Sequence, residues 1–277
     1  MFEQKWQNTK PPKGVLLNAG HPLAKGLVGF WLMNEGGGNK VFDLSGNNNS
    51  GKFLAGLYSP SWSSGRFGPA LSFDGNDTVN LSSLITFAAN TPYTVILWCY
   101  VNAWDAAYRF AISRGTSGTS EKIGINNDAA YFFIRSVNSG ASDITVSLPS
   151  VGAWHFLTLT RNLANKIDFY IDGGSPSRLY GDAAQSGIAA WGKIGDTAGQ
   201  YWNGRIDNVM IFNRALTAQE ITWLYREPFC MFDKARLWGA GEAGPTNLKS
   251  VNGVALASIK SINGVAIANV KSVNGIT

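Results

Sequence analysis

Apolar and polar residues alternate over many short stretches of this chain, and residues typical of tight turns separate the stretches. Residues 154–173 alternate in this way on both sides of a turn, which predicts an antiparallel hairpin with one buried and one solvent-exposed face. Residues 93–101 are apolar at both alternating sets of positions, which predicts a central strand covered on both sides. Several shorter strands are expected between residues 104 and 150, and Asp74-Gly75 predicts the turn of another hairpin.

A strand that runs straight into a short helix occupies residues 203–227. Both predicted faces of this strand are apolar, with Ile206, Met210 and Phe212 on one face and Val209 and Ile211 on the other. Thr217 and Glu220 have the spacing of a capping box, in which each side chain accepts a hydrogen bond from a free N–H at the start of the helix. The helix is therefore expected to begin after Thr217 and to end before Pro228.

The composition agrees with a β-sandwich of short strands and tight turns. The 277 residues include 32 glycines, 10 tryptophans and 15 phenylalanines, and 15% of the residues are charged. The net charge of +5 comes from scattered lysines and arginines, so we expect no nucleic-acid groove. No stretch predicts membrane insertion, and residues 1–14 lack the apolar segment of an export signal, so we expect folding in the cytoplasm. Cys99 and Cys230 allow a disulfide, but we expect two reduced thiols.

The chain divides into an N-terminal arm (1–25), a body (26–227), a linker (228–246) and a C-terminal repeat (247–277). In the repeat, lysine and Asn-Gly recur every eleven residues among β-branched residues, which predicts short strands joined by tight turns. Three such units cannot bury an adequate core, so we expect them to pair with neighbouring subunits or a sheet edge; the alternative is a flexible tail. The residues expected to serve in this assembly are Lys249, Asn252, Gly253, Lys260, Asn263, Gly264, Lys271, Asn274 and Gly275.

The closing sequence RIDNVMIFNRAL, followed by TAQEI, resembles the last strand and helix of laminin-G-like, concanavalin A-like jelly rolls. Six earlier segments resemble the same family in the same order, at residues 26–38, 43–51, 68–81, 91–101, 154–162 and 167–174. The resemblance covers residues 26–227 and implies an all-β, two-sheet antiparallel jelly-roll sandwich. It also implies that residues 27–33 form a strand beside the closing strand. The arm, one short helix after the last strand and the C-terminal β-repeat complete the expected architecture.

The resemblance also implies a structural calcium site, because related domains often bind calcium near residues 43–51. This loop offers Asp43 and the amide of Asn48, and Asp207 is the nearest expected second carboxylate if the first and last strands are neighbours. The alternative is a turn held by its own side-chain oxygens, without a metal.

The sequence shows no recognisable pattern of catalytic residues. The glucanases that share this fold carry glutamates at alternate positions of one strand, whereas no two of the six glutamates here lie two or four residues apart. His155 alternates with core residues, so we expect it to serve in packing. We therefore predict a protein that is not an enzyme, and we rank a glycosidase last.

Sugar binding is a hypothesis that the resemblance supports. Jelly rolls of this family often hold glycans at the loop end or on the concave face, where a tryptophan or tyrosine lies under the sugar ring. The candidates here are Trp104, Tyr108, Tyr201 and Trp202, with Arg114 for polar contacts.

Both ends of the chain also resemble segments of bacteriophage surface proteins, namely NAGHPLAKGLVGFWLMNEGGG and the VNG repeat. This resemblance favours a non-enzymatic virion protein, either a head decoration protein or a tail-associated protein. It would lie on the virion surface as a homo-oligomer and dock on the major capsid or tail protein through its terminal segments. The alternative is a lectin or adhesin that binds host or environmental polysaccharide.

Overall fold

The computed structural model describes most of the chain, in two compact units. It describes residues 6, 8–54, 56–103, 107–116, 122–125, 131–135, 143–147, 150–164, 166–178, 188–196, 198–232, 250–251, 254–255, 261–262 and 265–266. Unit 1 is Met1–Phe232 and unit 2 is Asp233–Thr277. Within these described ranges, no helix has the length and apolar character needed to cross a membrane.

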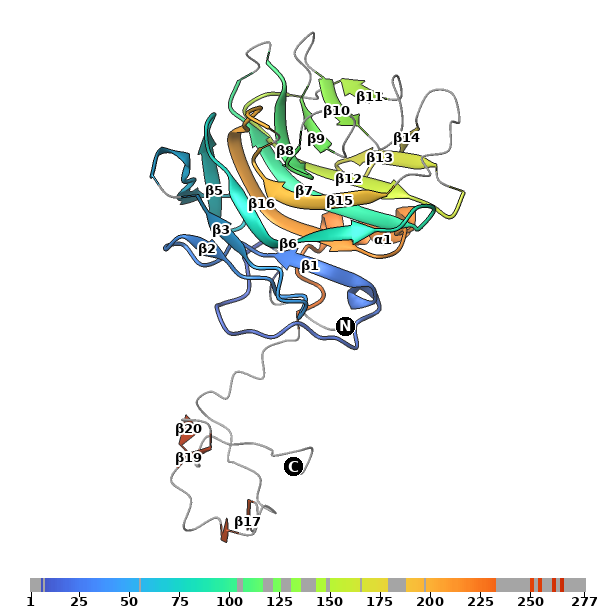
Figure 1. The fold of residues 1–277 in the computed structure, drawn as a ribbon. Coiled ribbons are helices and arrows are strands. Elements are labelled where there is room, and N and C mark those ends of the chain that lie inside the picture. Colours follow the sequence, from blue (N-terminus) through green and yellow to red (C-terminus); the bar gives the residue numbers. More distant parts are fainter. Residues whose placement is uncertain are drawn as a thin grey trace. The chain divides into compact units, whose positions relative to one another are not determined.

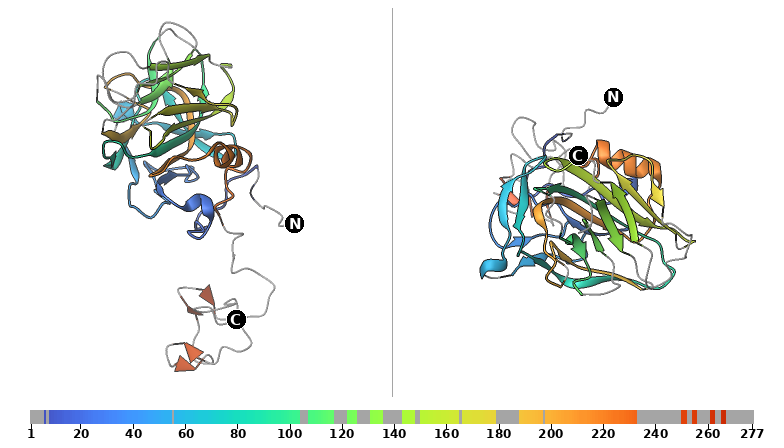
Figure 2. Two further views of the ribbon diagram at one scale, coloured as in Figure 1. Left: turned by 90° about the vertical axis from the view of Figure 1, so that its right-hand side faces the viewer. Right: turned by 90° about the horizontal axis from the view of Figure 1, so that it is seen from above.

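Unit 1 is an antiparallel sandwich of two sheets, as predicted (Figures 1 and 2). Sheet 1 has the order β14 (Ser177–Arg178), β13 (Ile167–Ile171), β12 (Trp154–Arg161), β7 (Tyr93–Val101), β16 (Asn203–Phe212), β5 (Pro69–Asp74), β4 (Ser61–Ser64). An eighth strand of this sheet, β1 (Leu27–Trp31), also pairs with β16. Sheet 2 has the order β11 (Asp143–Ser147), β10 (Tyr131–Arg135), β9 (Lys122–Ile125), β8 (Arg109–Ser113), β15 (Ala189–Ile194), β6 (Val79–Phe87), β3 (Gly51–Phe53), β2 (Lys40–Val41). Two short 3-10 helices, η1 (Pro22–Ala24) and η2 (Gly56–Tyr58), and one α-helix, α1 (Ala218–Arg226), complete the unit.

Strands β7 and β16 form the middle of sheet 1, and β1 lies beside β16, which confirms the predicted neighbours. Every residue of β7 except Tyr100 is buried. The inner core lies between the two sheets and includes Val95, Leu97, Trp31, Trp191, Trp202 and Ile206.

A β-bulge in β16 changes the two faces that strict alternation predicts. The register with β7 shifts between Asp207 and Met210, and Asn208 has a φ of 50°. The extra residue reverses the alternation, so Ile206 faces the inner core together with Val209 and Ile211. The predicted grouping of Ile206 with Met210 and Phe212 was therefore wrong.

The outer side of sheet 1 carries a second apolar layer, the outer core. Strands of the sheet contribute Phe30, Ile96, Trp98, Phe156, Tyr170, Met210 and Phe212 to it. Helix α1 covers them with Ile221 and Leu224, the arm adds Leu23, and residues 228–232 add Phe229, Met231 and Phe232. Figure 2 shows α1 on the outer flank of the sandwich.

The outer core corrects two predictions. The 154–173 hairpin exists as β12 and β13, but both of its faces are buried because the outer core covers the face that was predicted to meet solvent. Residues 228–232, predicted to belong to a linker, are part of unit 1, where the backbone of Leu17 forms a β-bridge with that of Phe232. The apolar residues of this segment would be exposed to water if it were an open linker.

Asp74-Gly75 forms a turn, but it does not close a hairpin. Gly75 has the positive φ of 102° that such a turn requires. The strand before the turn, β5, belongs to sheet 1, and the strand after it, β6, belongs to sheet 2. The chain therefore crosses from one sheet to the other here, which sequence alternation alone does not reveal.

Helix α1 confirms the predicted capping box. The Thr217 hydroxyl accepts a hydrogen bond from the Glu220 N–H at 3.2 Å, and a Glu220 carboxylate oxygen accepts one from the Thr217 N–H at 2.9 Å. The helix ends at Arg226, before Pro228.

Unit 2 contains two short antiparallel hairpins. Strand β17 (Ser250–Val251) pairs with β18 (Val254–Ala255), and β19 (Ser261–Ile262) pairs with β20 (Val265–Ala266). Two residues separate the strands of each hairpin, in agreement with the predicted Asn-Gly turns. The nine predicted assembly residues themselves lie outside the described residues.

Candidate functional site

Aromatic side chains gather where the loops of the two sheets meet at one end of the sandwich. Tyr58 in η2 and Tyr201 before β16 stack with ring centroids 6.4 Å apart and an interplanar angle of 29°. Tyr58 is 45% exposed, and its neighbour Leu57 is 84% exposed, so the apolar surface is open to solvent. We call Tyr58, Tyr108, Arg109 and Tyr201 the loop-end patch.

Backbone and side-chain hydrogen bonds hold this patch together. The Thr78 N–H donates to the Tyr58 carbonyl at 3.2 Å, which fixes η2 against the turn that follows β5. Arg109 Nη1 donates to the Tyr201 carbonyl at 3.3 Å, and the backbone of Phe110 bridges that of Tyr201. These contacts place a guanidinium beside the exposed rings.

The structure brings together two of the five residues predicted to bind sugar. Tyr108, whose ring stacks on that of Phe110, and Tyr201 belong to the loop-end patch. Arg114 is exposed but follows the last residue of β8, at the opposite end of that strand from Tyr108. Trp202 is fully buried in the inner core, so the prediction that its ring lies under a sugar was wrong. Trp104 lies outside the described residues.

Sequence reasoning missed Tyr58 and Arg109. Each stands next to an element boundary, Tyr58 at the end of η2 and Arg109 at the start of β8. Tyr58 and Tyr201 are far apart in sequence, and they become neighbours only when the two sheets pack together. Gly56 before Leu57 and Tyr58, and Ser59-Pro60 after them, were the available signal for an exposed aromatic loop.

Both carboxylates predicted to bind calcium, Asp43 and Asp207, have other partners, and so does the backbone carbonyl of Asn48. Both carboxylate oxygens of Asp43 accept backbone N–H groups, from Phe30 and Ser45 on Oδ1 and from Asn49 on Oδ2, each at 2.9 Å. The Asn48 carbonyl accepts a hydrogen bond from the Ser82 hydroxyl at 2.9 Å. Among the described residues, no three His, Cys, Asp or Glu side chains form a metal-binding group. The loop fits the alternative interpretation, a turn held by its own oxygens, and thermal unfolding with added calcium or with chelator tests the calcium prediction.

Asp207 is fully buried and forms an ion pair with Lys10 from the arm. Lys10 Nζ also donates to the carbonyl oxygens of Met33, at 2.9 Å, and of Pro69, so all three of its protons have acceptors. Burial raises the pKa of Asp207 to about 7 against the opposing charge of Lys10, and burial also lowers the pKa of Lys10. The position predicted for a metal ion therefore holds an ammonium group, which fastens the arm to the central strand.

Ser150, His155 and Asp172 lie in a line that resembles a catalytic triad. His155 Nδ1 is 2.8 Å from Asp172 Oδ2, and Nε2 is 3.2 Å from the Ser150 hydroxyl oxygen. However, Nε2 is also 3.1 Å from the Ser150 carbonyl oxygen. A carbonyl only accepts hydrogen bonds, so this contact places a proton on Nε2, which then cannot take one from the hydroxyl. The three residues join the loop before β12 to the turn after β13, and His155 has the packing role that was predicted.

His155 is expected to make the stability of the fold depend on pH. Burial lowers the pKa of His155, but the hydrogen bond and charge of Asp172 outweigh burial, and the pKa is raised above its ordinary value. The stabilisation is therefore complete below about pH 6.5 and is lost as pH rises through the pKa of the folded state. Urea unfolding at a series of pH values above and below about 6.5 measures how the free energy of unfolding depends on pH.

Asp172→Asn is the matched variant for this test. It removes the charge, and asparagine tolerates the φ of 52° found at position 172. The variant should lose the part of the pH dependence above about pH 6.5 that comes from His155. Equal slopes of unfolding free energy against pH in the two proteins would contradict the assignment.

Two stacked antiparallel sheets with an outer layer on one of them define this chain as a lectin-like jelly roll. The family model described as the concanavalin A-like lectin/glucanases superfamily matches residues 73–222, which is more than half of the chain. The protein belongs to this superfamily, as the sequence resemblance predicted. A comparison with curated proteins gave no match.

Solved structures with the same fold include binding domains and enzymes. The binding domain of Paraclostridial Mosquitocidal Protein 1 is 17% identical, with a TM-score of 0.56, over 73% of this chain and 52% of that one. Domain 4 of AbnA, a GH43 extracellular arabinanase from Geobacillus stearothermophilus solved with arabinotriose, is 17% identical, with a TM-score of 0.55, over 72% of this chain and 98% of that one. Trypanosoma rangeli sialidase is 13% identical, with a TM-score of 0.53, over 75% of this chain and 34% of that one. At these identities the similarity establishes the fold alone.

Proposed function

We propose that unit 1 is a non-enzymatic carbohydrate-binding module whose ligand lies on the loop-end patch. The observation that carries the proposal is the stacking of the exposed Tyr58 on the half-buried Tyr201, beside the guanidinium of Arg109. The C–H face of a sugar ring packs on such aromatic surfaces, and a few polar groups at the rim select its hydroxyls. Two structural neighbours support this proposal, namely the binding domain of Paraclostridial Mosquitocidal Protein 1 and domain 4 of AbnA, which was solved with arabinotriose.

Tyr58→Ala and Tyr201→Ala are each expected to weaken glycan binding by about tenfold, since each removes one stacking surface. A glycan array with the wild-type protein identifies a ligand, and calorimetry with that ligand measures the two variants. Tyr58→Phe keeps the ring and should retain most of the affinity. Leu163→Ala changes an exposed apolar residue in the loop between β12 and β13 and should have no effect. Unchanged binding in both tyrosine-to-alanine variants would refute this location.

We further propose that unit 2 attaches the protein to the surface of a tailed-bacteriophage virion, on its head or its tail. The repeated hairpins favour this second function, because a hairpin with strands of two residues is too small to be stable in water by itself. Pairing with a capsid or tail protein, or with other copies of the chain, would extend these short strands. The jelly roll is then available to bind polysaccharide. Co-sedimentation with purified particles, described in the Discussion, tests this proposal.

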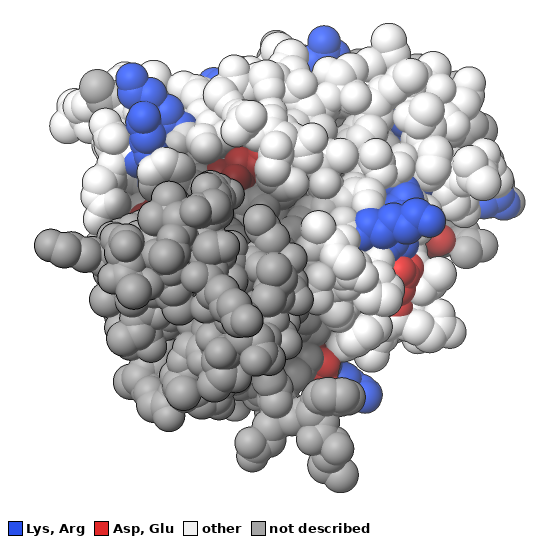
Figure 3. All heavy atoms as spheres, turned by 90° about the horizontal axis from the view of Figure 1, so that it is seen from below, with Lys and Arg blue, Asp and Glu red and all other residues white. Residues whose placement is uncertain are grey.

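On the face drawn in Figure 3, the described lysine and arginine side chains stand in separate groups, some of them next to acidic side chains. This distribution agrees with their scattered positions in the sequence. On this face, the described basic side chains form no continuous positive surface.

A further inference from the structure

A hollow lies on the exposed face of helix α1, and none of its lining residues belongs to the loop-end patch. Two rows of side chains line it, each with the four-residue spacing that aligns neighbours along a helix. They are Gln219, Trp223 and Glu227 in one row and Ala218, Thr222 and Arg226 in the other. The hollow has a volume of about 470 Å³, which lies within the usual range of small-molecule sites.

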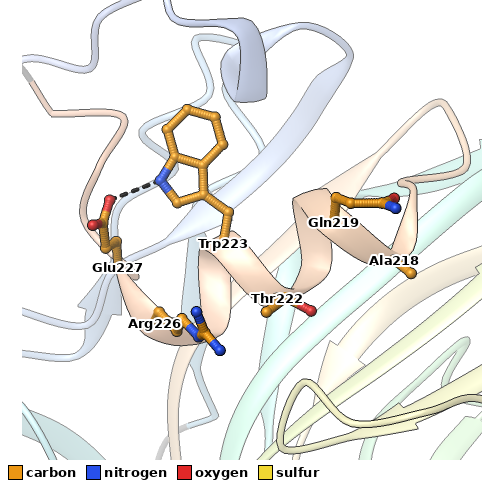
Figure 4. Close-up of a pocket in the computed structure, with 6 residues that line it drawn as sticks. All are labelled: Ala218, Gln219, Thr222, Trp223, Arg226 and Glu227. Carbon is orange, nitrogen blue, oxygen red and sulfur yellow. Dashed lines mark hydrogen bonds between the residues drawn. The ribbon is translucent and has the colours of Figure 1, made fainter.

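Trp223 is held in a fixed orientation at this hollow. Its indole N–H donates to Glu227 Oε2 at 2.7 Å, as Figure 4 shows, and the ring of His21 packs against it at 5.2 Å and 58°. The residue is nevertheless 39% exposed. The capped helix below is anchored by buried Ile221 and Leu224, so the indole is presented from a rigid base. A preorganised ring loses little entropy when a ligand packs on it.

Polar groups without partners flank this indole. Arg226 and Gln219 are exposed, and neither makes an ion pair or a side-chain hydrogen bond within the part of the chain that the structure describes. Arg214, by contrast, is paired with Glu220 at 2.8 Å. Arg226 follows Trp223 by three positions and Gln219 precedes it by four, so both are surface neighbours of the indole on the helix. Gln219, Trp223 and Arg226 all line the hollow, so a ligand bound in it can contact the indole, an amide and a guanidinium.

We propose that this face of α1 binds a carboxylate-bearing saccharide, such as a uronic acid residue of a polysaccharide. The indole supports the apolar face of the sugar, Gln219 pairs with its hydroxyls, and the free guanidinium of Arg226 takes its carboxylate. A guanidinium matches the two oxygens of a carboxylate, and this charged pair is stronger than a hydrogen bond between neutral groups. The site extends the proposed glycan binding to a second location and does not depend on the loop-end patch.

The test compares oligogalacturonate with its methyl ester, which has the same rings without the charge. Calorimetry should show that wild-type protein prefers the acid, and that Arg226→Gln lowers affinity for the acid by about tenfold to a hundredfold. The same variant should leave affinity for the ester unchanged. Trp223→Ala should weaken binding of both ligands, after circular dichroism has shown that the variant is folded.

Two control variants separate this site from the loop-end patch. Tyr58→Ala should leave binding of oligogalacturonate at α1 unchanged, whatever its effect on other glycans. Lys25→Gln removes an exposed positive charge outside the hollow and should also have no effect. The proposal is overturned if acid and ester bind equally, if neither binds, or if Arg226→Gln leaves affinity for the acid unchanged.

Discussion

Lys10→Met should lower the free energy of unfolding by about 3–5 kcal/mol, the usual cost of removing one member of a buried ion pair. The substitution keeps the apolar stem of the side chain but leaves Asp207, which is fully buried, without its cation. It also removes the donor to the carbonyls of Met33 and Pro69. Urea unfolding followed by tryptophan fluorescence measures the loss.

The loss should be largest at alkaline pH. Without Lys10, the pKa of Asp207 rises above its present value of about 7, so the folded variant holds a proton that the unfolded chain has released. Folded wild type keeps the same proton up to about pH 7, so the stability of the variant falls relative to wild type as pH increases above about 7. Lys13→Met, at an exposed position of the same arm, is the control and should change little. A loss in Lys10→Met below about 1 kcal/mol at pH 8 would show that the arm is held by other contacts.

Deletion of residues 246–277 should abolish attachment to virus particles while unit 1 keeps its melting temperature. Unit 1 is a compact body that ends at Phe232, and the deleted segment lies in unit 2. The deletion therefore removes the repeat and leaves the whole sequence of unit 1 in place. Co-sedimentation with purified particles and size-exclusion chromatography measure attachment and self-association.

A full-length variant separates the repeat structure from simple chain length. Replacing Gly253, Gly264 and Gly275 with valine keeps the length of the chain but opposes the positive φ of a two-residue turn. This variant should behave like the deletion. Normal attachment of both variants would assign docking to unit 1, whereas normal attachment of the valine variant alone would make the turns unnecessary.

Local chemistry predicted several parts of this structure correctly. The Thr217 and Glu220 cap depends on groups within one helical turn, so sequence spacing was enough to place the start of α1. The two-sided apolar pattern of residues 93–101 predicted the central strand β7, because a strand buried on both faces is mainly apolar at both sets of positions. The hairpins of unit 2 likewise follow from Asn-Gly turns between β-branched residues.

Features that join distant segments escaped sequence reasoning. The polar residues of β12 and β13 indicated a solvent-exposed face, yet α1, the arm and residues 228–232 form an outer core on that side of sheet 1. A single bulge at Asn208 reversed the faces of half of β16, and no periodicity marks a bulge in advance.

The sequence by itself determined the class of fold, the closing strand with its helix, the repeat and the aromatic and basic residues available for binding. The tertiary structure decided which of those residues meet. It buried Trp202, paired Tyr58 with Tyr201 across two loops, and gave Asp207 a lysine from the arm. The physical reason is that turns, caps and alternation depend on neighbouring residues, whereas burial and pairing depend on how two sheets and both ends of unit 1 pack together.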